Sequence, residues 1–122
     1  YKGELQHASP MVRHGLGIMY YKNLSTYDGD WVIDKRHGQG VMSYANGNRY
    51  DGGWKNHLRD GNGKFYSKVG SLNYDGQWSE DKKNGSGTKY FVNGSKYTGE
   101  IQNEQIHGKG EMWYPGGALE YK

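Results

Sequence analysis

The sequence contains no cysteine and only two prolines among its 122 residues. Without cysteine, the chain forms neither a disulfide framework nor a thiolate metal site, and this fits a reducing compartment. It also contains no apolar run near the roughly 18 residues that a membrane-spanning helix requires. These absences exclude a disulfide-stabilised scaffold and a helical membrane span within this sequence.

Aliphatic residues are scarce as well. Hydrophobic residues of all kinds make up 33% of the sequence, and the mean hydropathy is −1.10, which taken alone favours disorder. The 12 tyrosines, 4 tryptophans and 2 phenylalanines point the other way, because each ring buries roughly 150 to 250 Å² of surface. We therefore expect the chain to fold by burying aromatic rings in unit after unit rather than around one aliphatic core.

A segment that begins with tyrosine recurs along the whole chain. Successive starts are 26, 23, 24, 23 and 24 residues apart, at Tyr1, Tyr27, Tyr50, Tyr74, Tyr97 and Tyr121. A second landmark, a polar residue followed by Gly-x-Gly, begins ten residues after the tyrosine in the last four full units and thirteen residues after it in the first. A fixed period between about 20 and 50 residues indicates a repeat array.

The two landmarks divide the chain into repeats at residues 1–26, 27–49, 50–73, 74–96 and 97–120, with the start of a sixth at 121–122. The sequence starts at a unit boundary and stops just inside a sixth unit. We therefore expect residues 1–122 to be one array within a longer protein.

Each unit has the residue pattern of a β-hairpin. In the second unit Tyr27, Gly29 and Trp31 fall on one side of a strand, and the run 38–44 alternates in the same way, because side chains in a strand alternate faces. Residues 32–37, VIDKRH, read as a polar connection, and the Asn-Gly pair at 46–47 reads as a turn. Helix is disfavoured because each recurring glycine costs about 1 kcal/mol in a helix interior.

Glycine at fixed positions within the strands predicts how the rings are seated. A glycine inside a strand often marks the close approach of another group, so we expect Tyr and Trp rings to lie flat over glycine backbone. A larger residue at Gly40 or Gly63 should then push a ring out. Stacked hairpins give an all-β, elongated, single-layer antiparallel ribbon, and its accumulated twist curls it into a trough lined by the aromatic face.

The segment YDGDWVIDKRHGQGVMSYANG, residues 27–47, resembles the MORN (membrane occupation and recognition nexus) repeat. The pattern of that repeat is YxGxW, a short charged loop, GxG, alternating apolar or aromatic residues and an Asn-Gly or Asp-Gly turn. The resemblance covers essentially the whole chain. The departures are Leu5 and Ile101 in place of tryptophan, Gly53 in place of an acidic residue, Ser67 in place of an aromatic residue and Lys89 in place of an apolar one.

The resemblance implies a non-catalytic role in binding partner proteins, tethering to membranes, forming dimers or scaffolding cytoskeletal and ciliary structures. The aromatic face offers one site for this role, because a single sheet has no second layer to cover it, and exposed apolar patches mark interaction sites. We predict that a peptide or helix of a partner binds along the trough. The predicted contact residues are Tyr27, Trp31, Tyr44, Tyr50, Trp54, Phe65, Tyr74, Trp78, Phe91 and Tyr97.

Basic residues near the hairpin tips support an alternative, a membrane-edge module that binds anionic phospholipid. Each Lys or Arg near an anionic leaflet contributes about 1 kcal/mol, and we expect these residues to form a line along one edge. The net charge is only +3, and acidic residues in the same loops dilute the field. The residues of this alternative are Lys35, Arg36, Lys55, Arg59, Lys82 and Lys83.

Other chemistry has little support in the sequence. Carboxylates that recur in every unit, such as Asp28, Asp51 and Asp75, accompany no nucleophile and read as a solvated face that blocks aggregation. His14 and His37 would lie too far apart to share a metal, and the Gly-x-Gly pairs lack the helix of a phosphate loop.

We therefore expect no enzymatic activity, no cofactor, no metal and no nucleic acid partner. An unpaired terminal strand makes a homodimer plausible. The expected location is cytoplasmic, with the cytoskeleton or a membrane nearby.

Overall fold

The computed structural model describes residues 2–6, 12–114 and 119–121, and over these residues it consists of β-strands and turns. The strands are β1 Lys2–Gln6, β2 Val12–Tyr20, β3 Thr26–Val32, β4 Lys35–Ser43, β5 Arg49–Lys55, β6 Leu58–Tyr66, β7 Leu72–Ser79, β8 Lys82–Tyr90, β9 Lys96–Gln102, β10 Gln105–Trp113 and β11 Leu119–Tyr121.

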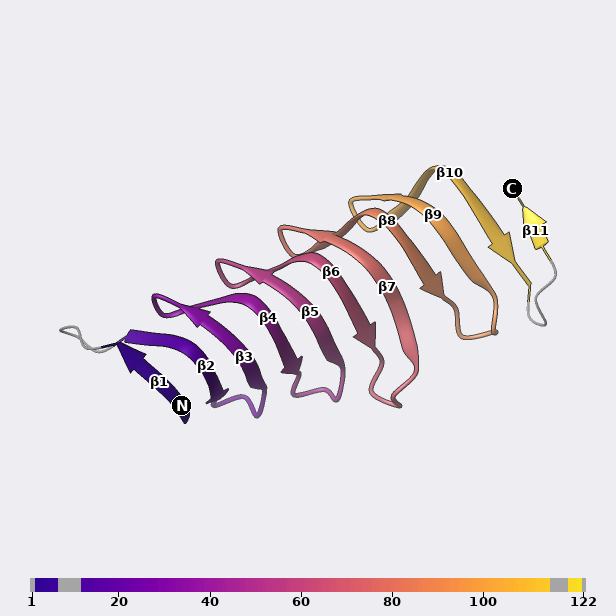
Figure 1. The fold of residues 1–122 in the computed structure, drawn as a ribbon. Helices are drawn as coiled ribbons and strands as arrows, with labels where there is room; N and C mark the ends of the chain where they lie inside the picture. Colours follow the sequence, from indigo (N-terminus) through magenta and orange to yellow (C-terminus); the bar gives the residue numbers. More distant parts are fainter. Residues whose placement is uncertain (1, 7–11, 115–118, 122) are drawn as a thin grey trace.

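All eleven strands form one sheet in sequence order, and each strand pairs antiparallel with the next. The strands are arched and follow one another along an elongated trough, with the two termini at opposite ends (Figure 1). No second layer packs on the sheet within the described ranges. The predicted single-layer ribbon of stacked hairpins is confirmed.

The connection inside each of the four hairpins from β3 to β10 is shorter than predicted. Strands β3 and β4 are joined by Ile33 and Asp34 alone, with φ of +44° and +66°, the conformation of a two-residue hairpin turn whose twist matches that of the strands. Lys35 and Arg36 pair with Val32 and Trp31 in the ladder. The prediction that residues 32–37 form a polar loop is therefore wrong, and the charged residues after the turn belong to a strand.

A bulge bends each central hairpin at the same point. The register between β3 and β4 shifts between Gly29 and Trp31, and Gly38 opposite has a φ of +96°, which glycine adopts without strain. The side chain of Asp30 secures the bulge, because its Oδ2 accepts a hydrogen bond from the backbone N–H of Gln39 at 2.9 Å. Bulged strands bend and twist more strongly, so repeated bulges produce the arch of the trough.

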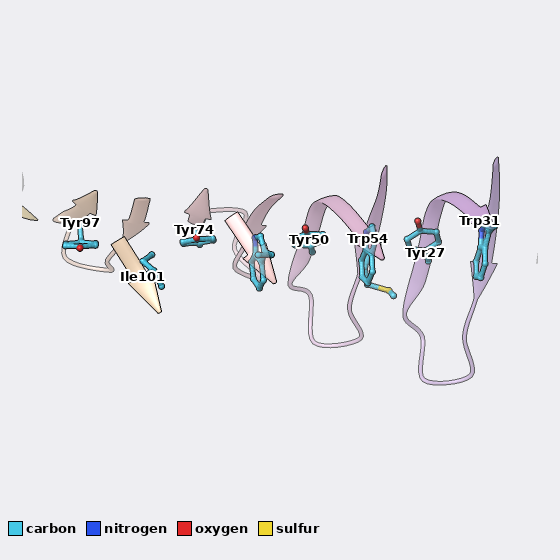
Figure 2. Close-up of a cluster of buried hydrophobic side chains, with 9 residues drawn as sticks. Tyr27, Trp31, Tyr50, Trp54, Tyr74, Tyr97 and Ile101 are labelled. Atoms are coloured by element: carbon cyan, nitrogen blue, oxygen red, sulfur yellow. The ribbon is translucent and has the colours of Figure 1, made fainter. Parts of the chain in front are cut away.

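The core is a ladder of tyrosine and tryptophan rings along the inner side of the arch (Figure 2). The ladder runs in the order Trp31, Tyr27, Trp54, Tyr50, Trp78 and Tyr74, and neighbouring rings pack edge to face with centroids 5.1 to 5.4 Å apart. Such pairs contribute about 0.5 to 1.5 kcal/mol beyond the burial of their area. Ile101 and Tyr97 continue the buried row at the C-terminal end.

Glycines seat the tyrosine rings as the sequence predicts. A Cβ atom added to Gly40 would run into the ring of Tyr27, and one added to Gly63 would run into Tyr50. The Tyr27 hydroxyl donates a hydrogen bond to the carbonyl of Asp30 at 2.9 Å. Tryptophan is held differently, because the indole N–H of Trp54 donates to the carbonyl of Gly40 in the preceding repeat at 3.0 Å. The second, third and fourth repeats are thus each linked to the one before by a hydrogen bond from a buried indole.

Candidate functional site

The concave face, the inner side of the arched strands, contains the rings that the sequence predicts as partner contacts. Seven of the ten predicted contact rings are buried there, with exposed fractions of 0 to 5%. They are Tyr27, Trp31, Tyr50, Trp54, Tyr74, Trp78 and Tyr97. These rings cover one another in the ladder, so a single sheet leaves much less aromatic surface free than expected. The prediction that these seven rings contact a partner directly is therefore corrected, because they form the core.

The remaining three predicted rings are partly exposed. Tyr44 and Phe65 pack against the ladder from the concave side, with their ring centroids 6.0 Å apart. Phe91 is 38% exposed. Tyr21, which the sequence reasoning did not select, packs against the same core beside Tyr44. We call Tyr21, Tyr44 and Phe65 the aromatic rim, because they are partly buried rings at the open surface of the concave face.

Four basic residues lie in a row on the same face, at equivalent positions near the start of β2, β4, β6 and β8: Arg13, Arg36, Arg59 and Lys83. We call them the cation row. The guanidinium of Arg13 lies 4.7 Å from the ring of Trp31, and that of Arg59 lies 4.6 Å from the ring of Trp78. Cation–π contacts of this kind contribute about 0.5 to 2 kcal/mol. The sequence reasoning placed Arg36, Arg59 and Lys83 near the hairpin tips along one edge of the ribbon, whereas they lie over the tryptophan rings.

Three members of the cation row pair with a carboxylate from the turn of the next hairpin. Arg13 Nε lies 2.5 Å from Asp34 Oδ1, Arg59 Nε lies 2.6 Å from Asp81 Oδ1, and Lys83 Nζ lies 3.9 Å from Glu104 Oε2. The hydrogen bonds from Arg13 lower the pKa of Asp34. For Arg59, burial alone would lower the pKa, but the hydrogen bond to Asp81, together with the nearby Tyr44 and the charges of Asp81 and Glu104, raises it. Three junctions between repeats are therefore joined by charge, and the indole hydrogen bonds of Trp31 and Trp78 span two of the same junctions.

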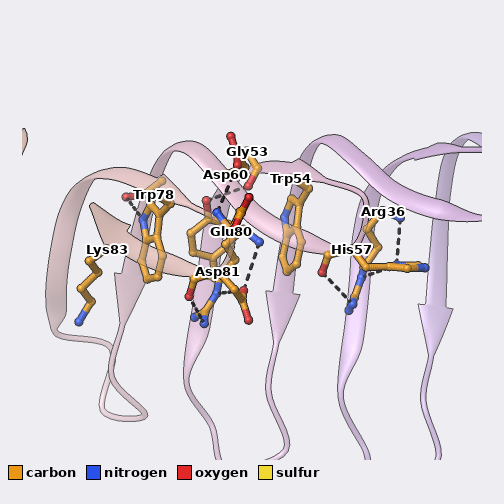
Figure 3. A network of polar contacts seen from close by, with 12 residues as sticks. Arg36, Gly53, Trp54, His57, Asp60, Trp78, Glu80, Asp81 and Lys83 are labelled. Atoms are coloured by element: carbon orange, nitrogen blue, oxygen red, sulfur yellow. Dashed lines mark hydrogen bonds and ion pairs between the residues drawn. The ribbon is translucent and has the colours of Figure 1, made fainter. Parts of the chain in front are cut away.

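Arg36 differs from the other three members, because the turn position that faces it is His57. Arg36 Nε donates to His57 Nδ1 at 3.2 Å, and Nη2 donates to the His57 carbonyl at 3.1 Å (Figure 3). Burial, followed by the nearby positive charges of Arg36, Arg13 and Lys35, lowers the pKa of His57. An open hollow of about 210 Å³ adjoins Arg36, lined by Tyr21, Asn23, Ser25, Arg36, Met42 and Tyr44.

The structure divides the six residues of the lipid-binding alternative between two faces. Arg36, Arg59 and Lys83 belong to the cation row on the concave face. Lys35, Lys55 and Lys82 are exposed and point to the outer face, because each is next to an inward-facing residue of its strand. The expected single line of six charges is therefore wrong.

In two repeats, a recurring acidic residue of the outer face accepts a hydrogen bond from the backbone of the facing strand. The carboxylate of Glu100 accepts the backbone N–H of Lys109 at 2.9 Å, as Asp30 does with Gln39. In the part of the chain that the structure describes, no three His, Cys, Asp or Glu side chains gather closely enough to hold a metal ion. The same described residues include no helix with the length and apolar character needed to cross a membrane.

The repeat pattern of the chain matches a known family. The family model of the MORN repeat matches residues 12–26, 27–49, 50–72, 74–96 and 97–118. No curated protein sequence matches the chain. MORN repeats are in general modules of interaction with proteins or membranes. Since the five matches span most of the sequence and the hairpins β3–β4, β5–β6 and β7–β8 repeat the same ring, glycine and bulge geometry, the chain belongs to the MORN repeat family.

Proposed function

We propose that this chain is a non-catalytic protein-interaction scaffold that binds a partner segment along its concave face. The observation that carries the proposal is the aromatic rim, which lies beside the cation row on a face that no described part of the chain covers. Tyrosine and arginine are among the residues most often found as binding hot spots. A groove with apolar rings and flanking charge fits an amphipathic helix or an extended peptide.

The buried ladder supports partner binding because it fixes the base of the concave face. Tyr50 and Trp54 are buried and each makes a hydrogen bond to a backbone carbonyl, so the floor of the concave face is fixed before a partner arrives. Preorganised surfaces lose less conformational entropy on binding. The partner would contact Tyr21, Tyr44 and Phe65 directly, and the ladder would hold these rings in place.

In this proposal the array tethers or organises cytoskeletal, ciliary or membrane-associated assemblies in the cytoplasm. Elongated arrays suit the role because a surface that continues from repeat to repeat gives one partner many equivalent contacts. Self-association through a terminal strand belongs to the same proposal, since an unpaired strand edge is a template for another strand.

The test compares the two faces of the sheet. A photo-crosslinking amino acid at Tyr44 should capture a partner from cell extract, whereas the same amino acid at Tyr66, on the outer face, should not. Tyr44→Ala combined with Phe65→Ala should reduce partner recovery at least about tenfold, which corresponds to a loss of about 1.4 kcal/mol. The matched control is Tyr20→Ala combined with Tyr66→Ala. Equal recovery by a folded concave-face variant would refute the proposal.

A second candidate function, contact with an anionic membrane, is supported by the exposure of Lys35, Lys55 and Lys82 on the outer face. Three lysines contribute about 3 kcal/mol at an anionic surface, and salt weakens this attraction. Co-sedimentation with phosphatidylserine vesicles should fall when all three are replaced by glutamine. Sedimentation that is independent of lipid charge would rule this candidate out.

A further inference from the structure

The cation row has one member whose charge is not matched within the described chain. Asp34, Asp81 and Glu104 each place a carboxylate within 4.0 Å of the cation that they face. His57 stands at the equivalent turn position of the third repeat and faces Arg36. No carboxylate of a described residue forms an ion pair with Arg36.

His57 holds the guanidinium in place without neutralising it. Its Nδ1 accepts hydrogen bonds from the backbone N–H and the Nε of Arg36, so Nδ1 carries no proton and the imidazole is neutral. The His57 carbonyl accepts a third bond, from Nη2. These contacts leave Nη1 without a hydrogen-bond acceptor among the described residues. Arginine presents five N–H donors in a fixed fork that suits a carboxylate.

The surroundings of Arg36 fit a single negative charge on an otherwise apolar group. The Arg36 guanidinium carbon lies 5.0 Å from the ring of Trp54 and 5.9 Å from that of Tyr21. Met42 and Tyr44 complete an apolar wall of the hollow, whose volume is about 210 Å³. A phosphate carries close to two charges, whereas Arg13 and Arg59, the members on either side of Arg36, already have their carboxylates. One unmatched cation beside apolar walls suits one carboxylate on a hydrocarbon stem.

We propose that Arg36 and the hollow beside it recognise an aspartate or glutamate side chain of a protein partner. The partner thus supplies to the second repeat the carboxylate that the chain itself supplies to Arg13, Arg59 and Lys83. This assignment rests on the proposed binding of a partner along the concave face. It specifies the chemical group that the partner presents to Arg36. It also sets the register of the partner, because among the described residues Arg36 is the one member of the cation row without a carboxylate.

The experiment is an NMR titration of the isotope-labelled full chain with N-acetyl-glutamate N-methylamide. Saturable shifts are expected for the Arg36 Nε–H and for the ring signals of His57. The corresponding glutamine derivative should give no saturable shift at the same concentrations. Inorganic phosphate provides a third arm, which should bind Arg36 more weakly than the carboxylate probe.

The decisive variant is His57→Asp, which gives the turn of the third repeat the residue that the second and fourth repeats present to Arg13 and Arg59. It should weaken the probe at least about tenfold, because the new carboxylate occupies the guanidinium as Asp34 and Asp81 do. Arg36→Gln should abolish the saturable shift. The hairpin should tolerate aspartate, because Asp34 and Asp81 hold the same turn with φ of +66° and +72°.

Three outcomes would each overturn the proposal: equal binding of the glutamine derivative, unchanged affinity in a folded His57→Asp variant, or tighter binding of phosphate than of the carboxylate. The proposed scaffold function is separable from them. If the crosslinking amino acid at position 44 captures no partner, the proposed scaffold function is refuted. If crosslinking persists in the His57→Asp variant and the affinity for the partner is unchanged, only the proposed recognition of a carboxylate by Arg36 is refuted.

Discussion

At the scale of single residues, glycine acts in two ways that one substitution each can separate. Gly40 lies under the ring of Tyr27, where an added Cβ would meet the phenol. Gly61 has open space around its Cβ position but a φ of +84°. The first position is reserved for glycine by packing, and the second by backbone conformation.

Gly40→Ala is therefore predicted to destabilise the array by about 3 kcal/mol, as overpacking of a tight core does, because the displaced ring of Tyr27 also loses its contacts with Trp31 and Trp54. Gly61→Ala should cost only about 1 kcal/mol, the strain of a left-handed alanine. Urea unfolding followed by tryptophan fluorescence measures both. Equal losses in the two variants would show that ring seating is not what reserves Gly40.

At the scale of the hairpin, the turns carry strain that other residues would relieve. Ile33, with a φ of +44°, is β-branched at a position where two-residue turns favour asparagine. Asn56 occupies the equivalent position of the next hairpin with a φ of +49°. Ile33 is 64% exposed, so its replacement removes little buried apolar surface.

We predict that Ile33→Asn stabilises the array by about 1 kcal/mol, since a left-handed β-branched residue is strained by about that amount or more. The reciprocal change Asn56→Ile should destabilise it by a similar amount. Thermal unfolding of the two variants beside the parent gives both values. A drop in stability for Ile33→Asn would mean that the exposed isoleucine makes contacts worth more than the strain.

Some features of the hairpin could be predicted from the sequence, and others could not. The period, the strands and the seating of Tyr27 over Gly40 were predictable, because they depend on spacing and on the missing side chain of glycine. The two-residue turn was not, since Ile33 and Asp34 lack the Asn-Gly signal of such turns. Because the two-residue turn was not predicted, Arg36 was assigned to a loop.

The burial of the rings was the second feature that could not be predicted from the sequence. Alternation along a strand places Tyr50 and Trp54 on one face, but it does not tell how strongly the sheet arches. The bulges make that arch, and rings of neighbouring repeats then cover one another. The proposed contact surface is therefore the aromatic rim, of which the sequence reasoning selected Tyr44 and Phe65 but not Tyr21.

At the scale of the whole molecule, the array folds without a second layer because one continuous ladder of rings joins the repeats. Each repeat contacts only its neighbours, so stability is the sum of the repeats and their interfaces. Tyrosines account for half of the ladder, and their hydroxyls are buried with it: Tyr27, Tyr50 and Tyr74. Alkaline pH therefore acts on more than one interface at once, including those between Tyr27 and Trp54 and between Tyr50 and Trp78.

Burial raises the pKa of Tyr74 from 10.0 to about 12, and burial also raises the pKa values of Tyr27 and Tyr50. The folded state thus favours the neutral phenol. Its contribution is complete below pH 10, the value for the unfolded chain, and is lost as the pH rises through the folded value. Each such tyrosine lowers the free energy of unfolding by at most about 1.4 kcal/mol per pH unit in that window.

We predict that the array unfolds cooperatively between pH 10 and about 12, with phenolate absorbance and loss of strand circular dichroism following the same curve. Tyr20 is exposed and lies outside the ladder, so Tyr20→Phe serves as the control and should leave the transition in place. Tyr74→Phe removes one of the coupled ionisations and should make the transition less steep. Ionisation of the buried tyrosines near pH 10 with the strands intact would contradict the prediction, because it would mean that water reaches the ladder in the folded array.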